Sequence, residues 1–179
     1  MTKLVPTADP ALRAKAKEIS PASIKSVKIK KLIAGMKKAL TKEDDGVAIA
    51  APQVGESLRL FIVSKKVFDY QREKSANSKV DEKASAYKDM VFINPKITKR
   101  SKEYGLVEEG CLSVRFVYGK VKRAKKATIT AQDETGKKFT MGGSGLLAQI
   151  FQHECDHLEG VLFIDKAVEL EDLPPTPKK

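Results

Sequence analysis

The stretch GGSGLLAQIFQHECDHL, residues 142–158, decides the interpretation of the whole chain. Its apolar residues recur with a helical period, which predicts a helix. Both histidines of the chain, His153 and His157, lie in it, and Glu154 directly follows the first. At about 100° per residue, the two imidazoles and the carboxylate share one face of that helix, whereas Cys155 points to the far side. This HExxH pattern predicts a metal site.

The face that carries the histidines continues towards the start of the helix. Leu146, Gln149 and Ile150 lie on the same stripe, one and two turns earlier. We therefore expect the histidines to face the interior, where a dry cavity strengthens electrostatic interactions. The alternative is a pair of hydrogen-bonded core histidines beside a surface glutamate, and short motifs do occur by chance.

Two histidines do not complete a catalytic metal site, which usually has three protein ligands and one open position. A metzincin protease continues as HExxHxxGxxH, and here Gly160 fits but Phe163 occupies the last position. A thermolysin-like protease takes a later glutamate, and the candidates Glu169 and Glu171 stand in a proline-rich tail. The remaining soft donor is Cys111, in LVEEGCLSV, although a lone cysteine is most often a small buried hydrophobe.

Composition limits the organisation of the chain. With 179 residues, 41% of them hydrophobic, we expect one domain over residues 1–166. The polar stretch at about 65–90 reads as an insertion or mobile loop, and residues 167–179 as a disordered tail. Neither a secretory signal nor an apolar run of about 20 residues is evident, which predicts a soluble cytoplasmic protein. In a reducing compartment, a disulfide between Cys111 and Cys155 is not expected.

The formal net charge of +11 concentrates in two runs, KSVKIKK (residues 25–31) and KVKRAKK (residues 120–126). Such runs usually form a solvated face of a helix or strand. No nucleic-acid-binding motif accompanies them, so we expect neither specific nucleic-acid recognition nor membrane binding. A loose, transient electrostatic association with the ribosome through this basic surface suits the charge.

Periodicity predicts the other elements. Helices are expected in ADPALRAKAKEIS near the N-terminus and over residues 23–43. Strands are expected at residues 58–64 and 90–98 and in VRFVYGKVKR, ATITAQD and KKFTM, with DETG as a turn between the last two.

Three spaced motifs resemble those of peptide deformylases. They are GVAIAAPQVG (residues 46–55), EEGCLSV (residues 108–114) and QHECDHLEG (residues 152–160), in the order found in that family. The resemblance extends over about residues 4–165, excluding the insertion. It implies an α+β fold in which mixed and antiparallel sheets pack around a central HExxH helix. It also implies hydrolysis of the N-formyl group from the N-terminal formylmethionine of newly synthesised polypeptides, with release of formate.

The resemblance also implies the roles of the site residues. Cys111, His153 and His157 become the metal ligands, and Glu154 the general base and acid that takes a proton from the attacking water and passes it to the departing amine. Asp156 is expected to position a metal ligand without binding the metal itself.

Gln53 and the backbone N–H of Leu112 are implied as donors to the oxyanion that forms during hydrolysis. On its own, Gln53 would read as an ordinary loop amide.

Substrate contacts are implied along the first two motifs and the helix. The residues expected to contact the peptide and its methionine side chain are Val47, Ala48, Val107, Gly110, Leu146, Gln149 and Ile150.

Three positions depart from the family pattern. Gln149 stands where an aliphatic residue is usual, Arg115 where proline is common, and Ala48 where the family has a second glycine. We expect Ala48 to have a negative φ and to narrow the groove beside the substrate, because its neighbours suggest an extended segment.

A thiolate and two imidazoles suit iron, zinc, nickel or cobalt, and affinity alone does not select among them. The resemblance favours ferrous iron. Two alternatives come from other classes of protein: a small metalloprotease with the same HExxH machinery, and a basic ribosome-associated protein without catalysis.

Overall fold

The computed structural model describes residues 2–75 and 88–173. The elements in chain order are η1 (Pro10–Leu12), α1 (Pro21–Ile24), α2 (Val27–Thr41), β1 (Ala48–Ala50), η2 (Ala51–Val54), β2 (Leu60–Val63), α3 (Lys65–Ser75), β3 (Met90–Arg100), β4 (Tyr104–Cys111), β5 (Val114–Ala124), β6 (Lys126–Gln132), β7 (Lys138–Ser144), α4 (Leu146–Leu158), η3 (Phe163–Asp165) and β8 (Val168–Asp172).

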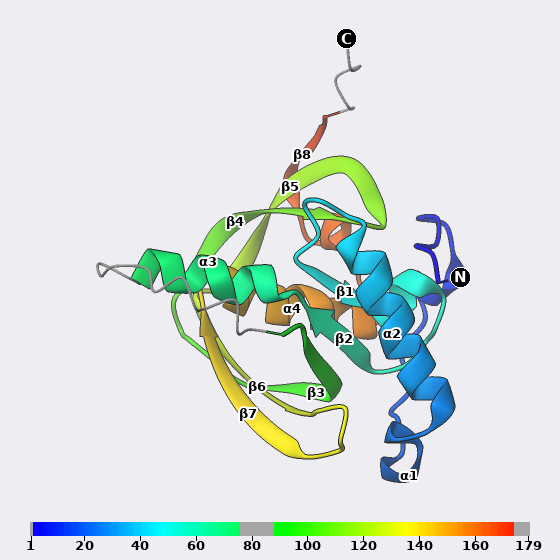
Figure 1. Cartoon of the computed structure of the whole chain (residues 1–179). Helices are drawn as coiled ribbons and strands as arrows, with labels where there is room; N and C mark the ends of the chain where they lie inside the picture. Colours follow the sequence, from blue (N-terminus) through cyan, green and yellow to red (C-terminus); the bar gives the residue numbers. More distant parts are fainter. Residues whose placement is uncertain (1, 76–87, 174–179) are drawn as a thin grey trace.

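The strands form two sheets, and helix α4 contacts strands of both (Figure 1). The larger sheet has the order β1-β2-β3-β6-β7, and the smaller has the order β4-β5-β8. The strands within both sheets pair antiparallel, and a separate parallel bridge joins Lys17 to Leu58. The expected α+β class is confirmed. Because β1 is at the end of its sheet, one of its edges faces away from β2.

Aromatic packing fixes α4 against the larger sheet. Phe61 of β2 and Phe92 of β3 stack with ring centroids 4.6 Å apart, and Phe151 of α4 lies 5.5 Å from Phe92. On β7, a Cβ at Gly143 would meet Leu147 at 2.9 Å and Phe151 at 3.0 Å. The glycine therefore permits the close approach of strand and helix. This packing holds the HExxH residues in a defined position.

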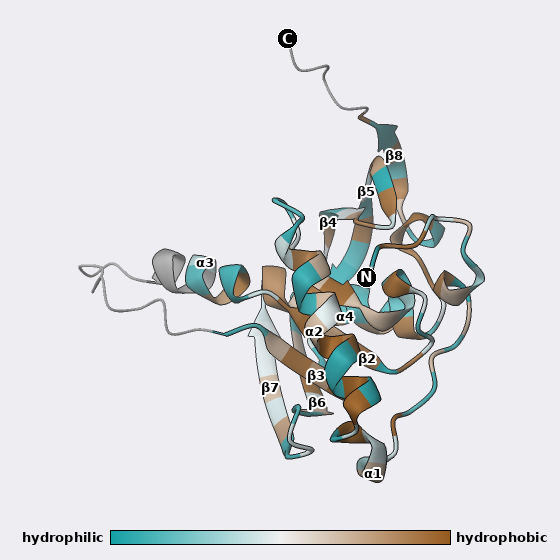
Figure 2. Ribbon diagram, turned by 45° about the vertical axis from the view of Figure 1, so that its right-hand side comes forward, coloured by the Kyte–Doolittle hydropathy of each residue, from teal (hydrophilic) through white to brown (hydrophobic). Residues whose placement is uncertain are grey.

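The basic helix predicted over residues 23–43 is broken into α1 and α2. Ser26 has extended backbone angles and its hydroxyl oxygen accepts a hydrogen bond from the N–H of Ile29 at 3.3 Å, so it caps a new helix. Figure 2 shows brown and teal segments alternating along α2, as expected of a helix with one buried face.

The helix predicted in ADPALRAKAKEIS is wrong beyond the single turn of η1. The N–H of Ala16 donates to the carbonyl of Leu158, and the N–H of Lys17 donates to the carbonyl of Ser57. These tertiary hydrogen bonds hold the segment extended, which outweighs its helical propensity. The strands predicted at residues 58–64 and 90–98 and in the three later segments are confirmed, but β4 was not foreseen as a strand.

The predicted disorder of the tail is wrong for residues 168–172. These residues form β8, which pairs with β5 through Val117–Asp172 and Lys120–Val168. Residues 174–179 lie outside the described residues. In the predicted insertion, residues 65–75 form α3, and residues 76–87 also lie outside the described part of the chain.

Candidate metal centre and active site

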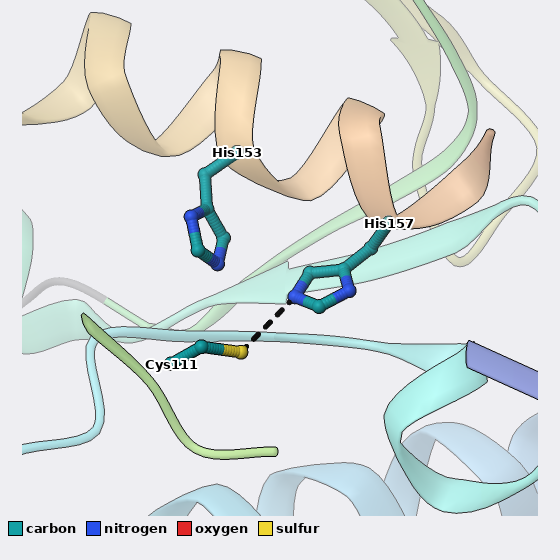
Figure 3. Close-up of side chains that lie close together, drawn as sticks. All are labelled: Cys111, His153 and His157. Atoms are coloured by element: carbon teal, nitrogen blue, oxygen red, sulfur yellow. Dashed lines mark hydrogen bonds between the residues drawn. The ribbon is translucent and has the colours of Figure 1, made fainter. Parts of the chain in front are cut away.

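Three donor atoms converge where the helix α4 faces the end of β4. The sulfur of Cys111 and one ring nitrogen each of His153 and His157 lie within 4.8 Å of one another. Figure 3 shows both imidazoles pointing from α4 towards the thiol, and the Nε2 atom of His157 lies 3.3 Å from Sγ. The structure thus brings together the three ligands that the motifs implied.

The two sequence segments reach this point by different routes. His153 and His157 are one helical turn apart, so their side chains leave the same face of α4. Cys111 is the last residue of β4 and opens the tight connection to Val114 of β5, which turns the thiol towards the helix. Cys155 points elsewhere and packs against the core cluster, as the helical projection predicted.

The donor set fits a divalent transition metal. Burial lowers the pKa of His157 well below its usual range, which keeps this imidazole in the neutral form that binds a metal. For His153, burial lowers the pKa, but hydrogen bonds to Cys111 and Glu109 raise it well above the usual range. A cation bound there would displace that proton. Three protein donors with a cavity beside them match a catalytic site with an open position.

Behind His153, a buried chain of charged groups fixes its orientation. Nδ1 of His153 lies 3.0 Å from Glu109, whose two carboxylate oxygens accept hydrogen bonds from Arg123 at 2.7 and 2.8 Å. Arg123 also donates to Asp156 at 2.5 Å, and Lys166 donates to Asp156 at 2.7 Å. Because Nδ1 is engaged, Nε2 of His153 remains for the metal. Asp156 thus contacts Arg123, which in turn contacts Glu109 beside His153.

Glu109 and Arg123 were missed by the sequence analysis. Arg123 lies in the run KVKRAKK, which was interpreted as solvated, yet its side chain is only 5% exposed. The burial pattern of β5 alternates, with Val121 and Arg123 on the inward face. Because side chains of a strand alternate between its two faces, the position of Arg123 two residues after Val121 indicates a buried side chain. Burial raises the pKa of Glu109, but hydrogen bonds from Arg123 and His153 outweigh it and lower the pKa to about 2.

Glu154 is a buried carboxylate beside the three donors. It is 4% exposed, and among the described residues its Oε2 atom has no hydrogen-bond partner. Burial raises its pKa to about 7, so that near neutral pH this group can both accept and donate a proton. An unpaired buried oxygen is costly, which is consistent with a partner arriving with the substrate or water.

Gln53 approaches the centre from η2. Its Oε1 atom accepts a hydrogen bond from the N–H of Ala50 at 2.7 Å, which orients the amide. Its Nε2 atom then lies 3.4 Å from the sulfur of Cys111 and 3.2 Å from the hydroxyl of Ser113. The donor end of a buried side chain is thus held beside the metal ligands.

A cavity of about 390 Å³ opens beside the centre. It is lined by Glu154, by the two predicted oxyanion donors Gln53 and Leu112, and by most of the residues expected to contact substrate: Val47, Ala48, Gly110, Leu146, Gln149 and Ile150. Val107 does not belong to the lining. It pairs with Val121 four residues before the end of β4, and the part of β4 that lines the cavity begins at Glu108.

The departures from the family pattern have structural counterparts. Ala48 lies in β1, and its φ is not positive, as expected. The amide of Gln149 donates to the carbonyl of Glu108 at 2.8 Å and so ties α4 to β4. Arg115 forms an ion pair with Glu43 at 2.8 Å.

Comparison with known proteins gives a match to the family model for polypeptide deformylase over residues 1–172. The chain belongs to the polypeptide deformylase family. It is 40% identical over 161 residues to the peptide deformylase of Dictyoglomus turgidum, covering 90% of this chain and 89% of that protein. It is 36% identical over 170 residues to peptide deformylase 1A of Arabidopsis thaliana, covering 94% of this chain but 62% of the longer plant protein.

Solved structures agree with this assignment. The crystal structure of a peptide deformylase from Legionella pneumophila matches with a TM-score of 0.78 and 33% identity, over 94% of this chain and 87% of that one. The structure from Thermotoga maritima matches with a TM-score of 0.75 and 32% identity, over 94% and 98%. Family membership makes this chain a metal-dependent hydrolase that removes the N-formyl group from nascent polypeptides. Membership of this family therefore excludes the alternative of a small metalloprotease.

Proposed function

We propose that Glu154 is the general base and acid of deformylation, and that Cys111, His153 and His157 hold the metal. The observation that carries the proposal is the unpaired, buried Oε2 atom of Glu154 beside the three converging donors. When bound, a divalent cation supplies a Lewis acid that acidifies water and polarises the formyl carbonyl. Glu154 takes the proton from the attacking water, the C–N bond breaks, and the same proton passes to the amine as formate leaves.

We propose that Gln53 and Leu112 stabilise the negative charge that develops on the formyl oxygen. The amide of Gln53 is already oriented by Ala50, so its donor end needs no reorganisation when that charge appears. Leu112 follows the ligand Cys111 directly and lines the cavity, which supports its backbone N–H as the second donor.

The peptide is proposed to bind along β1. This strand is at the end of its sheet, so an extended chain can add to its outer edge by backbone hydrogen bonds. Ala48 lines the cavity, and we propose that its methyl group narrows the groove beside the peptide. The methionine side chain then enters the apolar part of the cavity, beside Val47, Leu146 and Ile150.

Ferrous iron is proposed as the physiological metal. The ligand set also suits zinc, nickel and cobalt, so the choice rests on the family resemblance. Iron bound to a thiolate is open to oxidation, which predicts that activity declines in air.

The decisive experiment measures formate release from a formyl-Met-Ala-Ser peptide by anaerobically purified protein of known metal content. We expect formate and the free methionine amino group in equal amounts, and no internal cleavage of the same peptide without the formyl group. Prior incubation with a metal chelator should abolish release, and added ferrous iron should restore it. Absence of formate from metal-loaded protein would refute the enzymatic role.

A transient association with the ribosome in the cytoplasm is proposed through the exposed lysines of α2. Lys28, Lys31 and Lys38 recur on its solvated side and Lys42 follows its last residue, while the opposite side packs into the core. Within residues 2–75 and 88–173, no helix is long and apolar enough to span a membrane. Because the apolar side of α2 is already buried, this helix has charge but no apolar face to offer a partner, which favours RNA phosphates.

Co-sedimentation with ribosomes tests this association. We expect binding at low ionic strength that weakens steeply as salt rises. The double substitution Lys31→Glu and Lys38→Glu should weaken binding to the ribosome. Lys96→Glu with Lys99→Glu on β3 is the control, because it makes the same change in net charge at another place. Equal loss in both double variants would indicate a response to net charge alone and contradict a role for α2.

A further inference from the structure

Phe116 has a backbone conformation that bulky residues rarely adopt. Its φ is +65°, in the left-handed region, where a side chain with a Cβ is strained. Its side chain is 44% exposed, so packing in the core offsets little of that cost. A strained residue persists only where its surroundings impose the conformation, and such residues gather at functional sites.

Two neighbouring strands impose the conformation. On one side, the pairing of β5 with β4 passes from Gly110–Tyr118 to Cys111–Val114, which leaves residues 115–117 as a bulge without partners on β4. On the other side, the N–H of Leu173 donates to the carbonyl of Phe116 at 2.7 Å. The bulge is thus fixed between the hairpin and the end of β8.

The bulge forms part of the cavity wall. Arg115, Phe116 and Tyr118 line the cavity on this side, and Asp45 lines it near the start of β1. Arg115 also forms an ion pair with Glu43, two residues before Asp45 in the chain. Phe116 therefore presents a half-exposed aromatic ring to the cavity, at a place that the catalytic groups do not use.

We propose that Phe116 forms a subsite for the side chain of the residue that follows the formylmethionine, and that it selects an apolar or aromatic side chain. The inference rests on the proposed function, because a peptide with its formyl group at the ligands must continue out of the same cavity. The ring supplies apolar surface that a substrate side chain can cover.

The charges around the subsite oppose an acidic side chain. Arg115 is engaged by Glu43, and the carboxylates of Asp45 and Glu108 both line the cavity. A negative side chain at the second position would approach these acidic residues, and the described lining holds no lysine or arginine besides the paired Arg115 to balance it. The expected order of preference at this position is therefore phenylalanine, then glycine, then aspartate.

The test compares kcat/KM for formyl-Met-Xaa-Ser peptides in which Xaa is Phe, Gly, Lys or Asp. For the unaltered protein we expect the Phe peptide to exceed the Gly peptide by about tenfold, the lower end of what an apolar contact contributes to discrimination. In Phe116→Asn this ratio should fall towards one. Asparagine tolerates the left-handed conformation, so the melting temperature should be unchanged or higher.

Tyr104→Asn is the matched control, because Tyr104 lies at the other end of β4 and is also 44% exposed. It should keep the full Phe-to-Gly ratio. An unchanged ratio in Phe116→Asn, a lower melting temperature of that variant, or a Lys peptide preferred over Phe would overturn the subsite. If the unaltered protein releases formate from none of the four peptides, the proposed function itself is contradicted. If it releases formate from all four at equal rates, only the proposed subsite is contradicted.

Discussion

Replacing Glu154 with alanine is expected to lower kcat for deformylation by about 10²–10⁴-fold or more, while the protein keeps its metal. The carboxylate is buried beside the ligand cluster and is not itself one of the three converging donors. Its loss removes the group that moves the proton from water to the amine. The Cys111, His153 and His157 donors remain in place, so the metal content of the purified variant should stay stoichiometric.

The measurement is kcat with a formyl-Met peptide, together with elemental analysis of the same sample. Glu159→Ala serves as the control, because Glu159 follows the last residue of α4 and pairs with Lys15 and Arg59, away from the cavity. That variant should keep nearly full activity. A fully active Glu154→Ala protein would move the general base to another residue.

Replacing Cys111 with alanine is expected to abolish stable metal binding. Only His153 and His157 would remain as donors, and two imidazoles on one helix leave half of a tetrahedral site without protein ligands. Loss of a group that only positions a ligand weakens metal binding by about 10–100-fold. Loss of a ligand itself should therefore weaken metal binding by a larger factor. Metal content after dialysis against a weak chelator checks the result.

Cys155→Ala is the matched control for this variant. Burial raises the pKa of the Cys155 thiol to about 12, so it stays neutral and does not serve as a ligand. The control should keep its metal and its activity. Cys111→Ala with full, tightly held metal would show that another residue supplies the third donor.

The sequence predicted the cluster of donor atoms better than the residues that support it. The helical spacing of His153, Glu154 and His157 is a local property, because four residues of an α-helix fix which side chains share a face. Cys111 lies 42 residues before His153. Elimination of the other third ligands left it as a candidate donor, and the family resemblance then assigned it to the pair. Glu109 and Arg123 were missed because their partnership depends on strand register, which a charge run does not reveal.

The elements of the fold were predictable where local pattern and tertiary contacts agree. The later strands, with alternating burial, were found in their correct places. The N-terminal segment failed because hydrogen bonds to Leu158 and Ser57, far along the chain, hold it extended. β8 failed for a similar reason: its acidic, proline-flanked sequence suggests disorder, and its pairing with β5 alone makes it a strand.

The order of the parts along the chain has a consequence for biosynthesis. The donors come from residues 111, 153 and 157, and the hydrogen bond that fixes the bulge comes from Leu173. Translation proceeds from the N-terminus, so a growing chain has neither histidine until residue 153 of the 179 has been added. Metal loading must then be among the last events in the maturation of each molecule. A ribosome that stops before α4 releases a fragment that lacks two of the three candidate donors, so we expect such fragments not to compete with the finished enzyme for its metal.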